Sequence, residues 1–147
     1  MKLAYMVATP DVAAPAHVTA IQGPMDRALA VVRATGYTGV EFLVADPARI
    51  DRKALARAVA DTGLDVPAIC TGEVYGQDGL SFADPDPARR ALARERMHAA
   101  MDLAGEYGAM VNVGRLRGRF VEGVPRDQTL AWIGEAIAEA LDRTQGV

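Results

Sequence analysis

Apolar and polar residues alternate along this chain in four similar blocks. Each block begins with a short apolar run typical of a buried strand, and continues through a loop into a helical pattern. The expected strands cover residues 3–8, 39–44, 66–71 and 110–114. Each helical pattern closes on a glycine, which tolerates the left-handed backbone conformation that ends many helices. These glycines are Gly36, Gly63, Gly108 and Gly146.

The same pattern predicts where the helices begin. One is expected from about Met25, a second after Asp51, a third at Pro87 and a fourth from about Arg126. Asp51 and Asp86 are expected to cap helices, because their carboxylates accept from free backbone N–H groups. Residues 72–85 are expected to form a loop. The last helix is expected to bury one apolar stripe, made of Leu130, Ile133, Ile137 and Leu141.

Strands that alternate with helices predict a parallel sheet joined by crossover helices, the α/β class. Two architectures fit residues 1–147 as a single domain. One is an open four-stranded α/β sheet, and the other is half of a (β/α)₈ barrel, which typically needs about 250 residues. The half-barrel requires the strand order 1-2-3-4. Periodicity alone leaves both architectures open.

Composition limits the partners. The chain has a net charge of −3 with acidic and basic residues interspersed, whereas a nucleic-acid-binding protein usually has a basic face. No apolar run approaches the roughly 20 residues of a membrane helix, and the N-terminus does not resemble a signal peptide. Cys70 is the single cysteine, which fits a reducing compartment. We therefore expect a cytoplasmic protein with no nucleic-acid or membrane partner.

Familiar cofactor motifs are missing from the sequence. Neither a Gly-x-Gly-x-x-Gly turn nor a Gly-x-x-x-x-Gly-Lys-Ser/Thr loop occurs, which disfavours nucleotide binding. The two histidines, His17 and His98, have no acidic neighbours at ligand spacing, so no metal site is expected from them.

Polar residues at the strand ends are the candidates for binding, because α/β folds bind ligands at the carboxyl ends of their strands. Glu41 interrupts an apolar strand, and burying a carboxylate is costly unless it is paired or used. It is therefore either a structural carboxylate bonded to a neighbour or part of a substrate site. Cys70 ends a buried strand without a nearby histidine, so we expect it to line a pocket rather than to act as a nucleophile.

Three arginines follow the fourth strand. Arg115, Arg117 and Arg119 alternate at strand spacing and would share one side if the strand continued. Guanidinium groups suit carboxylate or phosphate groups. The alternative is a solvated loop with a salt bridge to Glu122 or Asp127.

Three segments resemble the xylose-isomerase-like family of TIM-barrel sugar (phosphate) isomerases and epimerases. Residues 69–82 (Ile-Cys-Thr-Gly-Glu-Val-Tyr-Gly-Gln-Asp-Gly-Leu-Ser-Phe) with Asp84-Pro85-Asp86 resemble the loop after the family's third strand. Residues 108–114 (Gly-Ala-Met-Val-Asn-Val-Gly) with 117–119 (Arg-Gly-Arg) resemble its fourth strand and loop. Residues 36–41 (Gly-Tyr-Thr-Gly-Val-Glu) resemble its second strand. The similarity runs along the whole chain and is greatest to the 5-keto-L-gluconate epimerase type.

This resemblance implies four βα units that form the N-terminal half of a (β/α)₈ barrel. It implies proton transfer next to a ketose carbonyl through an ene-diolate, with two glutamates and a divalent metal, Mn²⁺ or Mg²⁺. In the family these groups come from strands five to eight, so we expect no catalytic residue and no bound metal in this chain alone. The positions matching the substrate-lining side are Glu41, Cys70, Thr71, Glu73, Asn112, Arg117 and Arg119.

The resemblance also implies a partner. The sequence stops where the fifth strand would begin, so we expect a truncated or split barrel that is inactive alone. Its partners would be a sugar or sugar acid and either a second copy or a complementary C-terminal half. Two alternatives are a non-catalytic half-barrel that self-associates and a small α/β domain that binds an anionic ligand.

Overall fold

Four parallel strands form one sheet in the order β1-β2-β3-β4 in the computed structural model, which describes residues 2–13 and 19–145. The strands are β1 (Ala4–Ala8), β2 (Gly39–Leu43), β3 (Asp65–Cys70) and β4 (Met110–Asn112). This order confirms the half-barrel expectation, because in an open doubly wound sheet the order of the strands reverses, as in 2-1-3-4. The four strands lie within one or two residues of their predicted bounds.

The helices follow the strands as predicted. They are α1 (Met25–Ala34), α2 (Arg52–Thr62), α4 (Pro87–Tyr107) and α5 (Arg126–Gln145). Asp51 accepts a hydrogen bond from the Ala54 N–H, and Asp86 accepts one from the Ala88 N–H, so both predicted caps are confirmed. Gly63 and Gly108 end α2 and α4 in the left-handed conformation. Gly146 lies outside the described residues.

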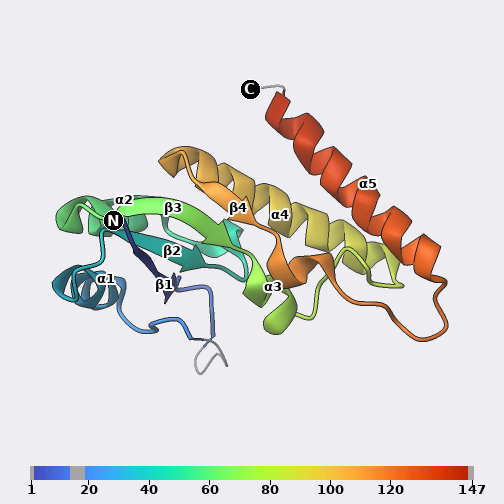
Figure 1. Cartoon of the computed structure of the whole chain (residues 1–147), viewed down its shortest axis with the longest axis horizontal. Coiled ribbons are helices and arrows are strands. Elements are labelled where there is room, and N and C mark those ends of the chain that lie inside the picture. Colours follow the sequence, from blue (N-terminus) through green and yellow to red (C-terminus); the bar gives the residue numbers. More distant parts are fainter. Residues whose placement is uncertain (1, 14–18, 146–147) are drawn as a thin grey trace.

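The main core lies between one face of the sheet and α1, α2 and α4 (Figure 1). Alternate strand residues point into it, among them Val7, Val40, Phe42 and Ile69, all fully buried. A second core joins α4 and α5 through Phe82, Leu116 and small residues of both helices. The residues between these strand positions face the opposite side of the sheet. In the described part of the chain, no helix has both the length and the hydropathy required to span a membrane.

The prediction for the last helix is wrong in one respect. Leu130, Ile137 and Leu141 of α5 are exposed by 48%, 39% and 57%, while Ala136 and Ala140 are buried. The small alanines let α5 pack closely against α4, and Figure 1 shows the two helices next to each other. The larger side chains of α5 therefore do not face α4 and remain exposed to solvent. Polar contacts also join the two helices, including Arg143 to Asp102 at 2.9 Å and Arg90 over the Trp132 ring at 4.0 Å.

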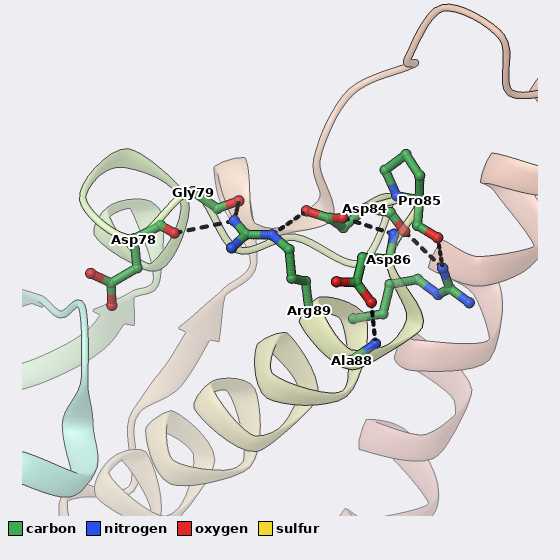
Figure 2. Close-up of polar contacts among 8 residues, drawn as sticks. Asp78, Gly79, Asp84, Pro85, Asp86, Ala88 and Arg89 are labelled. Atoms are coloured by element: carbon green, nitrogen blue, oxygen red, sulfur yellow. Dashed lines mark hydrogen bonds and ion pairs between the residues drawn. The ribbon is translucent and has the colours of Figure 1, made fainter.

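The expected loop at 72–85 contains a short helix, α3 (Gly72–Gly76), and a hydrogen-bonded turn. Arg89 of α4 holds this turn: its guanidinium donates to the Gly79 carbonyl at 2.8 Å and to the Asp84 carboxylate at 2.9 Å (Figure 2). Arg90 donates to the Asp84 carbonyl at 2.7 Å. The segment after β3 is therefore fixed to the start of α4, and it provides a firm wall beside the strand ends.

Candidate functional site

The face of the sheet opposite the helices carries the candidate site. Strand register places Met6 beside Glu41 and Glu41 beside Ala68, and it places Leu43 beside Cys70 and Cys70 beside Asn112. In a TIM barrel this face is the interior, and the carboxyl ends of the strands form the floor of the active site. Three of the predicted site residues, Glu41, Cys70 and Asn112, thus share one face.

Glu41 is half-buried in the middle of this face. It makes no hydrogen bond or ion pair with any residue of the described ranges 2–13 and 19–145. Its neighbours in register, Met6 and Ala68, have no side-chain hydrogen-bond donors. The structural alternative, a carboxylate bonded to a neighbouring side chain, therefore finds no partner in this part of the chain. The group remains available to accept hydrogen bonds from a ligand.

Thr71 ties β3 to β4. Its hydroxyl lies 3.0 Å from the Asn112 carbonyl and 2.9 Å from the Val113 carbonyl, and its N–H donates to Asn112 at 3.1 Å. The side chain is fully buried. The Thr71 hydroxyl therefore donates its proton to the β4 segment and has no further proton to donate to a sugar. Thr71 contributes to the site by holding the ends of β3 and β4 together.

Glu73 pairs with Arg115 across the strand ends. The Glu73 carboxylate is buried in α3, and the Arg115 guanidinium donates a short hydrogen bond to it. Gly76 provides the room for this pair, since a Cβ there would lie 2.5 Å from Arg115 Nη2 and 2.5 Å from Glu73 Oε1. Glu73 is the buried partner, since the Arg115 side chain is 52% exposed, so removing Arg115 would leave an uncompensated buried carboxylate. Glu73 is therefore a carboxylate that positions Arg115.

Cys70 lines a hollow of about 440 Å³ at this end of the sheet. Met6, Leu43, Gly72 and Arg115 complete much of its wall. Burial is the main cause that raises the pKa of the Cys70 thiol above 9.0, and the charge of Glu41 raises it further, while Arg115 opposes both. The thiol is thus neutral near pH 7 and acts as a small apolar wall.

We expect this raised pKa to slow alkylation of Cys70. At pH 8 iodoacetamide is expected to react severalfold more slowly with the chain than with free cysteine, because the thiolate is the nucleophile. Arg115→Gln is expected to slow the reaction further, since it removes the positive charge that favours the thiolate. Arg57→Gln on the exposed face of α2 is the control. A rate equal to that of free cysteine would contradict the described environment.

The strand does not continue through the three arginines, so they do not share one side of it. After Asn112 the chain turns into a 3₁₀ helix, η2 (Gly114–Arg117), and Gly118 follows with φ +86°. Arg115 turns toward Glu73, whereas Arg117 and Arg119 line a hollow of about 430 Å³ with Tyr75 and Gly114. Neither forms a salt bridge to Glu122 or Asp127.

The described residues do not fit a catalytic metal. Among residues 2–13 and 19–145 no three His, Cys, Asp or Glu side chains converge closely enough to hold an ion. Glu73 is committed to Arg115, and His98 lies 3.3 Å from Glu139 on α5, far along the chain from the strand ends. His17 lies outside the described residues.

Sequence reasoning missed two features of the site. The first is that Met6 and Leu43 line the Cys70 hollow. Leu43 lies two residues after Glu41, so the period-two pattern of β2 puts both on one face, but only the strand register shows that Met6 of β1 lies beside Glu41. The Glu73–Arg115 pair joins residues 42 positions apart. No local sequence pattern predicts a contact between residues so far apart in the chain.

Comparison with known proteins agrees with this geometry. The xylose isomerase-like TIM barrel family matches residues 29–147. L-ribulose 3-epimerase of Mesorhizobium japonicum is 34% identical over 110 residues, which are 73% of this chain and 36% of that enzyme. The chain thus spans little more than a third of that relative.

Solved structures share the fold. D-allulose 3-epimerase of Methylomonas sp., in complex with D-allulose, matches 92% of this chain and 45% of its own chain, with TM-score 0.63 and 18% identity. 3-Keto-D-glucoside 4-epimerase of E. coli matches 92% of this chain and 50% of its own, with TM-score 0.62 and 12% identity. The four βα units of this chain correspond to about half of each barrel. Together with the match over residues 29–147, this shows that the chain belongs to the xylose isomerase-like TIM barrel family.

Proposed function

We propose that this chain forms the substrate-binding side of a sugar epimerase or isomerase. The observation that carries the proposal is the open face of the sheet, where the unpartnered Glu41 carboxylate and Asn112 share one face with Cys70. Carboxylate and amide groups suit the hydroxyls of a sugar or sugar acid. The family and the epimerase names of its relatives support the reaction class.

In the proposed reaction, a proton leaves the carbon next to a keto group and returns on the other face or at the neighbouring carbon. The first outcome is an epimer and the second an isomer. This chain contributes binding rather than the proton transfer itself. Glu41 would accept hydrogen bonds from substrate hydroxyls, Asn112 would donate and accept them, and the Cys70–Leu43–Met6 wall would exclude water from one side.

A divalent metal, Mn²⁺ or Mg²⁺, remains part of the proposal through the resemblance. Such an ion polarises a carbonyl and the adjacent hydroxyl. The described residues do not offer its ligands. We therefore assign it to residues beyond those described, and we propose that the chain alone neither holds the ion nor turns over substrate.

We further propose that the chain works in an assembly, either with a second copy or with a complementary C-terminal half. Two features support an assembly. Within the described residues β4 pairs only with β3, so its other edge is open, and the exposed apolar residues of α5 lie beside it. The β1 edge is partly covered, because the backbone of Ile21 hydrogen-bonds to Met6 and Ala8 there. The contact surface should therefore centre on β4 and α5.

Solvent proton exchange tests the proposed function. The chain would be mixed with the last four βα units of the Mesorhizobium japonicum L-ribulose 3-epimerase, and assembly would be checked by sedimentation. In D₂O with Mn²⁺, L-ribulose is expected to lose its C3 proton signal only in the assembled mixture, and Glu41→Gln should slow this loss while Glu122→Gln should not. An assembled complex without exchange would contradict an enzymatic role, and it would favour a non-catalytic half-barrel.

A further inference from the structure

The loop after β4 presents two arginines without carboxylate partners at the rim of the site. Arg117 and Arg119 are both exposed, and neither makes an ion pair within residues 2–13 and 19–145. Arg115, the third arginine of this loop, is already neutralised by Glu73. The loop therefore carries two uncompensated positive charges beside a hollow of about 430 Å³.

The structure holds this loop firmly. Leu116 between the arginines is fully buried, and its carbonyl accepts from the Phe82 N–H at 3.0 Å. The Gly118 N–H donates to the Arg115 carbonyl at 2.9 Å, and a Cβ at Gly118 would lie only 2.6 Å from Ser81 Oγ and 2.7 Å from Ala83 Cβ. A fixed backbone lowers the entropy cost of placing two guanidinium groups around one ligand group.

The hollow lined by Arg117 and Arg119 lies next to the Cys70 hollow, because Gly114 and Arg115 line both. The two hollows differ in the charge around them. Glu41 lies on the same sheet face, two residues before Leu43 of the Cys70 hollow, and would repel an anion there, whereas Arg117 and Arg119 would attract one at the rim.

We propose that this chain recognises a sugar derivative with a terminal anionic group, which Arg117 and Arg119 bind at the rim while the hydroxylated part faces the Cys70 hollow. The inference rests on the proposed function, and it narrows the substrate class. The similar proteins are named for L-ribulose, D-allulose and a 3-keto-D-glucoside, which are uncharged. A carboxylate and a phosphate share the chemistry that two guanidinium groups bind.

Calorimetric titration of the 147-residue chain with three matched polyols tests the proposal. Glucitol is neutral, gluconate adds a carboxylate, and glucitol 6-phosphate adds a phosphate to a similar carbon chain. At least one anion is expected to bind about tenfold more tightly than glucitol, and higher salt should reduce this difference. The anion that binds more tightly identifies the source of the charge. Equal affinity for all three ligands, or no measurable binding of either anion, would overturn the proposal.

Variants locate the binding group. The pair Arg117→Gln and Arg119→Gln together should lower anion affinity at least about tenfold and leave glucitol binding unchanged. Arg117→Lys with Arg119→Lys should restore part of the affinity, and the thermal midpoint of each variant checks its folding. Arg57→Gln is the control, because it removes an exposed charge from α2. Unchanged anion affinity in the double glutamine variant, or an equal loss in the control, would overturn the proposal. Because binding is measured without turnover, a failed exchange experiment would leave this result standing.

Discussion

The purified chain is expected to sediment as a dimer or larger assembly at micromolar concentrations, well above its monomer mass of 15.6 kDa. The open edge of β4 offers unpaired backbone groups to another strand. Next to it, α4, β4 and α5 enclose a groove of about 420 Å³ lined by Met97, Met101, Val111, Ile137 and Leu141. An apolar groove beside an unpaired strand edge favours association, because contact removes both from water.

Charge placed on α5 should weaken this association. Ile137→Glu and Leu141→Glu are each expected to shift the sedimentation profile toward monomer, since they place a carboxylate in the groove. Val31→Glu on α1 is a matched control, because Val31 is also apolar and 50% exposed but lies on a different helix. A monomer at every concentration that binds no apolar dye would contradict the proposed contact surface.

Replacing Gly118 is expected to destabilise the fold strongly. Gly118→Ala would strain a backbone with φ +86° and push a Cβ to 2.6 Å from Ser81 Oγ and 2.7 Å from Ala83 Cβ. At φ +86° and ψ −163° a side chain costs about 1 to 3 kcal/mol in backbone strain, and overpacking adds about 1 to 3 kcal/mol. Chemical denaturation should therefore show a loss of about 2 to 6 kcal/mol in the free energy of unfolding.

Gly123→Ala separates the two causes. Gly123 has a similar φ of +83°, but nothing lies within 4 Å of its Cβ position. Gly123→Ala is therefore expected to cost only the backbone strain of about 1 to 3 kcal/mol. Equal losses for the two variants would mean that the loop after β4 is not packed against Ser81 and Ala83.

Local patterns predicted most of the fold. Strands and helices followed from hydrophobic period and from caps such as Asp51 and Asp86, whose hydrogen bonds lie within a few residues. The strand order could not be derived from periodicity, since the same elements suit an open sheet and half a barrel. The resemblance to a known family resolved it, and the observed order confirms that resemblance.

The errors arose where tertiary contacts override local periodicity. In α5 the predicted apolar residues Ile137 and Leu141 are exposed, because Ala136 and Ala140 allow a closer approach to α4 and are buried instead. The alternation of the three arginines left open whether the strand continues through them, and Gly114 and Gly118, with φ +48° and +86°, turn the chain instead. The Glu73–Arg115 pair could not be predicted from local sequence patterns, because the two residues belong to different βα units.

The proposed function requires that a sugar binds on the open face of the sheet at the carboxyl ends of its strands. Amide chemical shifts of the ¹⁵N-labelled chain during titration with L-ribulose, the sugar of the proton-exchange experiment, test this binding most directly. We predict that the shifts cluster at residues 70–76 and 112–119, and that Glu41→Gln weakens them. Shifts centred on the opposite strand ends near Gly39 and Asp65, or in the groove between α4 and α5, would contradict the account.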